Sequence, residues 1–245
     1  MRCELGKLRN GPPIRYWTYA PRQEENDMSQ GWDASAQAWI EVIGDDGDWG
    51  RRHVLDAPML ARATRGGLRN AIDIGCGEGR FCRMLQAQGI ATTGIDPTAA
   101  LIERARALHP EGDYRAERAE ALSAVDATYD LAVAYLSLVD IPDLRKALAE
   151  VHRVLRPGGT LLIANLQSFN TASIDQGWTR EPDGSRRFCI DHYLDERAVW
   201  AEWRGIRIQN WHRPRQASSC GISPSPCPMA PAMKRRRATG AHQTF

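Results

Sequence analysis

Three glycines at alternate positions, Gly75, Gly77 and Gly79, directly follow a short apolar run that contains one acid, Asp73. Glycine leaves no side chain to pack and costs conformational entropy, so such a cluster marks a tight turn or a close backbone approach. A chain with this feature must end a buried strand here and turn sharply into the next element. The glycines therefore predict a loop against which a flat or charged ligand lies.

The sequence from residue 70 onward alternates short apolar runs with amphipathic stretches. Short apolar blocks bounded by glycine or proline indicate strands, and apolar residues spaced three to four apart indicate helices. Strands are predicted over 70–75, 91–96, 113–120, 129–138 and 160–166, and helices over 79–89, 97–109 and 141–155. Alternation at these lengths requires right-handed crossovers. The predicted fold class is α/β, a Rossmann-like, doubly wound and mostly parallel sheet with helices on both faces.

Further elements are predicted on either side of this pattern. Apolar residues at helical spacing predict helices over 32–44 and 53–64, and Pro58 restarts the second of them. Segments 198–203 and 206–211 alternate in polarity around an Arg-Gly pair, which predicts an antiparallel hairpin.

Composition divides the chain into three parts. The 245 residues are 42% hydrophobic and 25% charged, which fits a globular protein with one full core. Residues 1–30 are polar and contain several prolines, and residues 215–245 are rich in Pro and Ser without apolar periodicity. We expect one domain over 31–214 between a loosely ordered N-terminal extension and a disordered basic tail.

Charge, cysteine use and hydropathy exclude several classes of protein. The tail carries Arg215 and the run 234–237 without any acid, so the rest of the chain is slightly acidic and a nucleic-acid partner is not expected. Six scattered cysteines form no CxxC pair, which indicates free thiols and no metal site. We find neither a membrane-spanning apolar run nor a secretory leader, and expect a cytoplasmic protein.

Two ligands compete for the glycine loop. The dinucleotide fingerprint G-x-G-x-x-G needs its third glycine at position 80, where this chain has Arg80. A carboxylate at Asp73 would also repel a pyrophosphate, although it suits a cationic group. A nicotinamide dinucleotide therefore remains only an alternative ligand.

Four motifs occur in an informative order: "DIGCGEG", "GID" ending at Asp96, "YDLAVAY" and "VLRPGGTLLIAN". Together they resemble the class I S-adenosylmethionine-dependent methyltransferase family, most closely its small-molecule, quinone-biosynthesis-like branch. The resemblance covers about residues 30–214. It implies an enzyme that transfers a methyl group from S-adenosylmethionine to a small-molecule acceptor by in-line displacement. A decayed or truncated module that binds S-adenosylmethionine without catalysis is the alternative.

The resemblance also implies roles for the residues of the glycine loop. Gly75, Gly77 and Gly79 pass under the amino-acid and ribose parts of the ligand, and Asp73 lies near the methionine ammonium, directly or through water. Asp96, at the end of the second strand, accepts hydrogen bonds from both ribose hydroxyls. A second role for Asp96, N-capping the helix that follows it, is compatible with the first.

The adenine subsite departs from the family pattern. The family often has Asp-Ala after the third strand, where this chain has Arg118-Ala119-Glu120. Arginine only donates hydrogen bonds and cannot replace an acceptor for the adenine amino group. We expect the Ala119 backbone to meet the adenine edge, with Glu120 nearby.

Methyl transfer mainly requires a nucleophile held in line behind an already activated methyl group, and a base is needed only for some acceptors. Tyr135, just past the fourth strand, is a candidate for catalysis and for cofactor binding. The other candidates for catalysis are Ser137, His192 and His212. Trp32 and Trp39 either roof an acceptor pocket or pack in the core.

The C-terminal part is unusual for the family. Relatives continue after an "HRP"-like motif with a helix and two more strands, whereas this chain departs from that pattern after Pro214. Arginine outnumbers lysine 29 to 3, which indicates GC-rich coding DNA. We hypothesise a frameshift at about codon 215, so that the last strands of the sheet are missing and strand 160–166 is a bare edge. A genuine basic tail that binds nucleic acid is the alternative.

Overall fold

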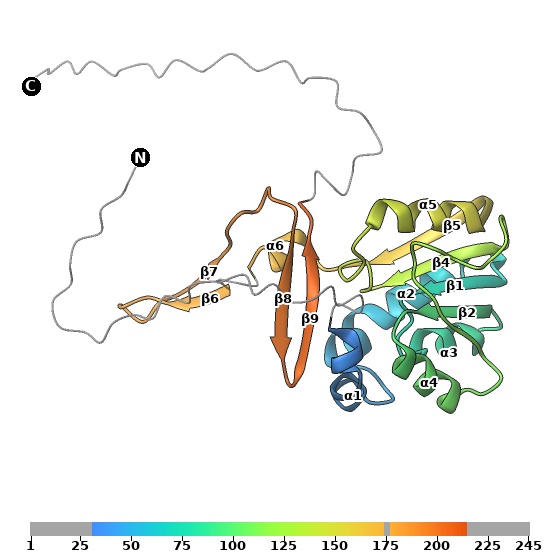
Figure 1. Ribbon diagram of the computed structural model, residues 1–245, viewed down its shortest axis with the longest axis horizontal. Coiled ribbons are helices and arrows are strands. Elements are labelled where there is room, and N and C mark those ends of the chain that lie inside the picture. Colours follow the sequence, from blue (N-terminus) through green and yellow to red (C-terminus); the bar gives the residue numbers. More distant parts are fainter. Residues whose placement is uncertain (1–30, 174–176, 215–245) are drawn as a thin grey trace, which may run out of the picture.

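The computed structural model describes residues 31–173 and 177–214 (Figure 1). Its centre is a five-stranded parallel sheet in the order β3-β2-β1-β4-β5. The strands are β1 (Asn70–Ile74), β2 (Ala91–Asp96), β3 (Asp113–Ala116), β4 (Tyr129–Tyr135) and β5 (Leu155–Ala164). The predicted doubly wound α/β sheet is confirmed, and its strand order reverses between β1 and β4. The expectations for 1–30 and 215–245 lie outside the described residues.

Helices cover both faces of the sheet. They are α1 (Trp32–Ile43), α2 (Asp56–Ala63), α3 (Arg80–Gln86), α4 (Ala99–Leu108), α5 (Leu144–Val154) and α6 (Ser168–Thr171), with a π-helical turn over Arg51–Leu55 and a 3₁₀ turn over Arg65–Gly67. Side chains of α2 and α3 pack on one face of β1 and β4, and side chains of α5 pack on the other. Because both faces are buried, the strands appear in the sequence as continuous apolar runs.

The structure corrects the predicted boundaries of β3 and β5. Strand β3 ends at Ala116 and not at residue 120. Strand β5 begins at Leu155, which pairs with Tyr129, so the Pro-Gly-Gly run lies within the strand and not before it. The pairing then jumps to Leu131 with Thr160, and the glycines absorb this irregularity. The predicted restart of the second helix is confirmed, because Pro58 lies in the first turn of α2.

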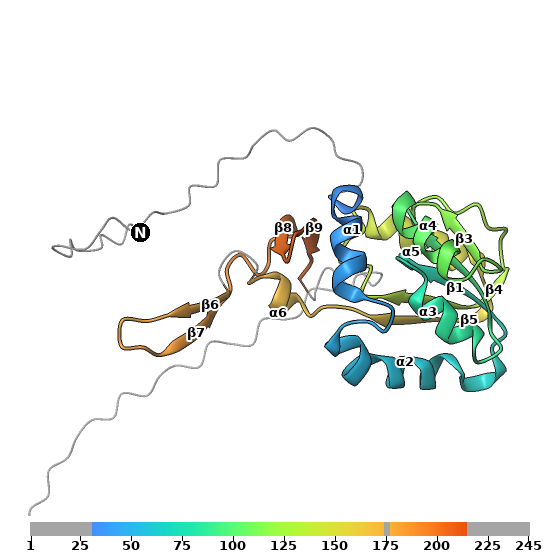
Figure 2. The same ribbon diagram turned by 90° about the horizontal axis from the view of Figure 1, so that it is seen from below.

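Two hairpins follow the sheet. The predicted hairpin is confirmed as β8 (Arg197–Trp203) and β9 (Ile206–His212). Its two turn residues, Arg204 and Gly205, have φ of 47° and 81°, as a tight turn between twisted strands requires. A second hairpin, β6 (Gly177–Arg180) and β7 (Arg186–Cys189), was not foreseen and projects away from the sheet (Figure 2).

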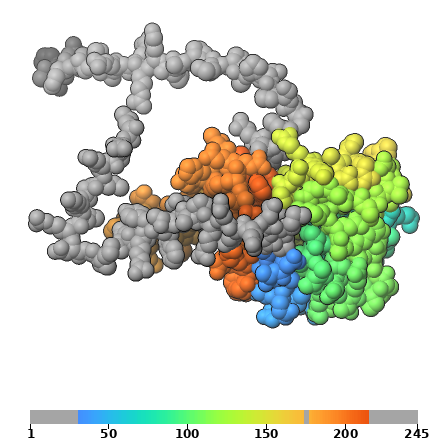
Figure 3. Space-filling view, in the orientation of Figure 1, coloured from blue at the N-terminus to red at the C-terminus, as the bar shows by residue number. Residues whose placement is uncertain are grey.

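Helix α1 is fastened to the β8–β9 hairpin and not to the sheet alone. The Ser35 hydroxyl donates to the carbonyl of Arg207 and accepts from the Arg207 amide, both at 3.0 Å. In Figure 3, α1 accordingly lies between the hairpin and the sheet domain. The elements at the two ends of the domain therefore form one layer over the carboxyl ends of the strands.

Within the described chain, β5 has a neighbouring strand on only one side. Ile163 and Leu166 are more than two fifths exposed there, at 45% and 42%. Residues 215–245 lie outside the described ranges, so the expected bare edge stays a prediction. No helix in the described ranges is long and apolar enough to cross a membrane.

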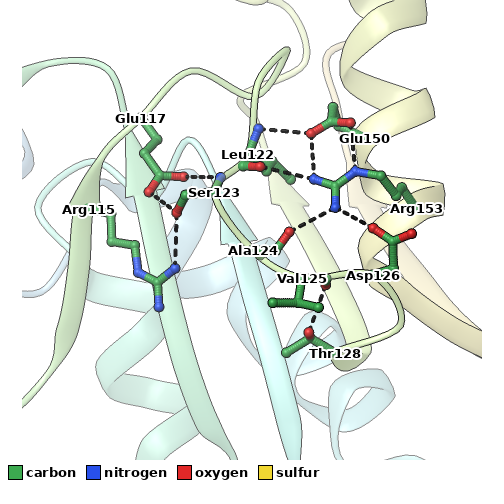
Figure 4. Close-up of polar contacts among 10 residues, drawn as sticks. All are labelled: Arg115, Glu117, Leu122, Ser123, Ala124, Val125, Asp126, Thr128, Glu150 and Arg153. Atoms are coloured by element: carbon green, nitrogen blue, oxygen red, sulfur yellow. Dashed lines mark hydrogen bonds and ion pairs between the residues drawn. The ribbon is translucent and has the colours of Figure 1, made fainter.

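A cluster centred on Arg153 clamps the loop between β3 and β4 onto α5 (Figure 4). Its guanidinium donates to both Glu150 carboxylate oxygens, at 2.8 and 2.7 Å, and to the carbonyls of Leu122 and Ala124. Glu150 in turn accepts from the Leu122 amide at 2.9 Å, and Asp126 accepts from Arg153 at 2.7 Å. These bonds hold the pKa of Glu150 down at about 2, mainly through Arg153.

We expect Glu150→Gln to make the free energy of unfolding depend less on pH below about 4.5. A carboxyl whose pKa is depressed by folding stabilises the fold fully above its ordinary pKa of 4.5, and this contribution is lost as pH falls towards 2. The difference in unfolding free energy between wild type and variant should therefore be largest near neutral pH and should shrink below pH 4.5. Urea unfolding at several pH values measures it, with the exposed Glu103→Gln as control. A difference that is constant with pH would contradict the clamp.

Candidate active site

A cavity of about 730 Å³ opens at the carboxyl ends of the parallel strands. Ligands of such sheets bind at this edge, next to the point where strand order reverses. One set of walls comes from the sheet: the glycine loop, the end of β2, and the loops after β3 and β4. The other set comes from α1, residues 48–51 and the β8–β9 hairpin. Its apolar side chains include Trp32, Trp39, Trp49, Trp203, Ile141 and Ile208.

The three loop glycines are required for three different reasons. Each has positive φ, which disfavours other residues. A Cβ at Gly75 would lie 2.5 Å from the Ser137 Cβ, and one at Gly79 would lie 2.5 Å from the Tyr114 ring. At Gly77 the nearest atom would be the Trp39 Nε1 at 3.9 Å, so a side chain there would enter the cavity. The structure thus brings Gly75 and Gly77 to the cavity, whereas Gly79 precedes α3 and packs inside.

Asp96 joins the glycine loop to the end of β2. One carboxylate oxygen accepts from the Gly77 amide at 3.0 Å and the other from the Thr98 amide at 2.9 Å. Burial raises the pKa of Asp96, and these two amides oppose that effect. A carboxylate has about four acceptor positions, so Asp96 keeps acceptor capacity for hydroxyl groups in the cavity that it lines. Helix α4 itself begins at Ala99, so Asp96 caps the turn before it.

Asp73 is buried, at 1% exposure, and does not line the cavity. One of its oxygens accepts from the Cys82 thiol at 3.4 Å, and the other has no hydrogen-bond partner among the described residues. Burial raises the pKa of Asp73 to about 7. A buried acceptor without a donor is costly, so it marks a place where a water or a cationic group fits.

The Arg118-Ala119-Glu120 segment lies at the cavity, where the sequence places it. Ala119 and Glu120 are both buried, and Arg118 donates to the Glu120 carboxylate at 3.3 Å. Because the Glu120 carboxylate is paired with Arg118, it is not free to bind a ligand. The Ala119 backbone is therefore the part of this segment that suits a planar ring such as adenine.

Tyr135 lines the cavity, but its hydroxyl is already used. It donates to Asp56 at 2.9 Å, and Asp56 also forms an ion pair with Arg80. Burial, followed by the Asp56 hydrogen bond, raises the pKa of Tyr135. The structure therefore makes Tyr135 a wall of the cavity and does not favour it as a base. Arg80 occupies the place of a dinucleotide fingerprint's third glycine and is held by Asp56.

The structure does not bring His212 to the cavity. It is fully buried between the Thr171 hydroxyl and the Tyr193 carbonyl, each 2.8 Å from one ring nitrogen. Ile208 and Asn210, on the same side of β9, line the cavity, but by His212 the strand has passed it and faces α6. The expectation of a catalytic role for His212 is thus corrected.

The structure also shows the surroundings of the remaining candidate residues. His192 is exposed beside Asp195, and Ser137 donates its hydroxyl to the Ile74 carbonyl. Trp32 and Trp39 both line the cavity, with ring centroids 5.3 Å apart.

The polar residues of the cavity that escaped the sequence analysis include Arg51 and Asp140. Arg51 pairs with Asp48 and lies over the Trp39 ring at 5.1 Å from its centre. Asp140 accepts from the Asn210 amide at 2.5 Å. The signal for Asp140 was its place five residues past the end of β4, since loops at this edge hold ligands.

Comparison with known proteins gives a consistent result. Residues 72–163 match the family model described as a methyltransferase domain. A malonyl-[acyl-carrier protein] O-methyltransferase of Erwinia billingiae is 32% identical over 53% of this chain and 51% of its own length. O-methyltransferase resE of Aspergillus sclerotiorum is 36% identical over 43% of each chain. The chain thus spans about half the length of these relatives.

A crystal structure of an S-adenosylmethionine-dependent methyltransferase from Mesorhizobium loti superposes with a TM-score of 0.60. It is 29% identical, and the match covers 71% of this chain and 79% of that one.

We expect Gly75→Ala to destabilise the protein more than Gly89→Ala. Both positions have φ above 70°, which costs an L-residue about 1–2 kcal/mol. Only Gly75 adds a clash with Ser137, because nothing lies within 4 Å of a Cβ at Gly89. Thermal unfolding measures both variants, and equal losses would contradict the close contact.

Proposed function

We propose that the chain is a class I S-adenosylmethionine-dependent methyltransferase, and that it transfers a methyl group from S-adenosylmethionine to a small-molecule acceptor. The domain that does this is proposed to span residues 31–214. The observation that carries the proposal is the Asp96 carboxylate, which is fastened to the Gly77 amide and faces a cavity with apolar, aromatic walls.

The residues present fit the chemical groups of this methyl donor. Asp96 has acceptor positions left for the ribose hydroxyls, and Gly77 leaves the space that a side chain would fill. The unpartnered oxygen of Asp73 suits the methionine ammonium, through a water since Asp73 does not reach the cavity. Ala119 offers its backbone to the adenine edge, and Glu120 stays paired with Arg118.

When bound, the donor supplies a methyl group already activated by a sulfonium. The protein's own contribution is then to hold the acceptor in line and to exclude water. Positioning of this kind supplies about 7–11 kcal/mol. Trp32 and Trp39 form an apolar wall suited to both tasks. The volume lies within the usual range for small-molecule sites, about 300–1,000 Å³.

The walls and the relatives together favour an apolar acceptor that is methylated on oxygen. Both curated relatives named above are O-methyltransferases. The aromatic and aliphatic side chains along α1 and the β8–β9 hairpin favour a ring or alkyl skeleton over a highly charged one.

We expect Asp96→Ala to lower the affinity for S-adenosylmethionine by at least about 100-fold. Two hydrogen bonds to a charged group are worth about 1.5–3 kcal/mol each, and 1.4 kcal/mol is tenfold. Titration calorimetry measures the affinity, with the exposed Asp183→Ala as control and circular dichroism to verify the fold. Unchanged affinity, or tighter binding of a nicotinamide dinucleotide, would overturn the proposed ligand.

Turnover separates an enzyme from a non-catalytic binding module. With methyl-labelled donor and a panel of hydroxyl, thiol and amine acceptors, we expect label in a hydroxyl compound together with S-adenosylhomocysteine. Binding of the donor without transfer to any acceptor would favour the module.

A further inference from the structure

Among residues 31–173 and 177–214, four carboxylates line the cavity, and three of them are engaged by strong donors. Asp48 is in an ion pair with Arg51, Asp96 accepts two backbone amides, and Glu120 is paired with Arg118. The fourth is Asp140. Within the described residues, its carboxylate receives a single hydrogen bond, at 2.5 Å from the neutral amide of Asn210. One oxygen of Asp140 is therefore left for a ligand.

The surroundings of Asp140 disfavour a charge. Asp140 is half-buried, and its neighbours in the wall, Val139, Ile141 and Pro142, are apolar. Burial raises the pKa of Asp140 to about 8, and the Asp96 carboxylate adds to this shift. Asn210 and the Arg51 guanidinium act in the opposite direction. A carboxyl group in this range gains and loses a proton near neutral pH, as a catalytic base must.

The loop that carries Asp140 is held in place by hydrogen bonds from Arg213 and from the backbone of β9. The Arg213 guanidinium donates to the carbonyls of residues 138, 141 and 142, at 3.0, 2.6 and 2.9 Å, and is itself paired with Glu196. The Trp211 amide donates to the Val139 carbonyl at 2.6 Å. Arg213 is thus a second cation beside this loop, but it is saturated by carbonyls and by Glu196. The loop and β9 place Asp140 and Asn210 together as a rigid pair.

No other described residue of the cavity fits the role of a base as well. None of the histidines in the described ranges lines the cavity. The Tyr135 hydroxyl is committed to Asp56, and the Ser137 hydroxyl is committed to a carbonyl.

We propose that Asp140 is the general base of methyl transfer, that Asn210 orients its carboxylate, and that the acceptor therefore carries a hydroxyl whose proton must be removed. This inference rests on the proposed function. As the acceptor oxygen forms its bond to the methyl carbon, the carbon–sulfur bond breaks and its electron pair stays on sulfur. The hydroxyl proton passes to the free oxygen of Asp140 and is later released to water. The products are the methyl ether and S-adenosylhomocysteine.

The first test compares acceptors that need a base with acceptors that do not. The probes are a phenol with a pKa of about 10 and a nitro-substituted phenol assayed where it is already ionised. We expect Asp140→Asn to lower kcat by about 10²–10⁴-fold for the first probe and by less than about tenfold for the second. The affinity for S-adenosylmethionine should not change. Asp140→Glu should restore part of the activity, and Asp183→Asn is the control.

The pH dependence provides a readout that a structural role would not move. For the wild type, kcat/KM should fall as pH drops through the pKa of Asp140, because the base becomes protonated. Asp140→Asn should lose this acidic limb. The proposal would be overturned if Asp140→Asn lowered kcat equally for both probes or did not lower it at all. It would also be overturned if the attacking atom of the acceptor carried no proton.

A direct titration needs no turnover. In protein labelled with ¹³C at aspartate carboxyls, the signal absent from Asp140→Asn should titrate far above the ordinary aspartate pKa of about 3.9. Asn210→Leu removes the one hydrogen-bond donor that the described part of the chain offers to Asp140, and should raise that pKa further. A signal that titrates near 4 would overturn the base role. Donor binding without any transfer would instead defeat the proposed function, so the two failures are distinguishable.

Discussion

The amide of Gly77 donates to the Asp96 carboxylate, and the amides of Gly75 and Cys76 share the carbonyl of Ile95. These bonds fasten the turn after β1 to the end of β2. They hold a glycine turn with positive φ in place and keep a carboxylate at the cavity surface. Burial disfavours that charge, so the backbone amides are needed to keep it available. The wall of the cavity that the sheet supplies depends on this one connection.

The opposite half is built from elements far away in the sequence. β9 contacts the loop after β4 through Trp211 and Asn210, and α1 is fastened to the neighbouring Arg207 through Ser35. These contacts close a cavity that the sheet alone would leave open. Arg213 completes the arrangement by binding three carbonyls of the same loop. One half of the cavity is therefore supplied by elements outside the central sheet, a division expected where function resides in segments carried by a common scaffold.

Clamps remote from the cavity fix its remaining wall. The Arg153 cluster holds the loop between β3 and β4 against α5, and this loop carries Ala119 and Glu120. The Asp56–Arg80 pair similarly links α2 to α3 and holds the Tyr135 hydroxyl. Charged residues for which the sequence indicates no structural role thus determine where the walls of the site lie.

Local patterns in the sequence determined the parallel sheet, the helices, the β8–β9 hairpin and the glycine loop, because periodicity and turn chemistry act over a few residues. They also determined that Asp96 ends β2, next to the loop. Only the tertiary structure decided that His212 faces α6, that Tyr135 is held by Asp56, and that Asp140 meets Asn210. Each of these pairings joins residues 41 to 79 positions apart. Partners at such distances are chosen by packing and by the direction in which strands leave the sheet, and no local pattern records that choice.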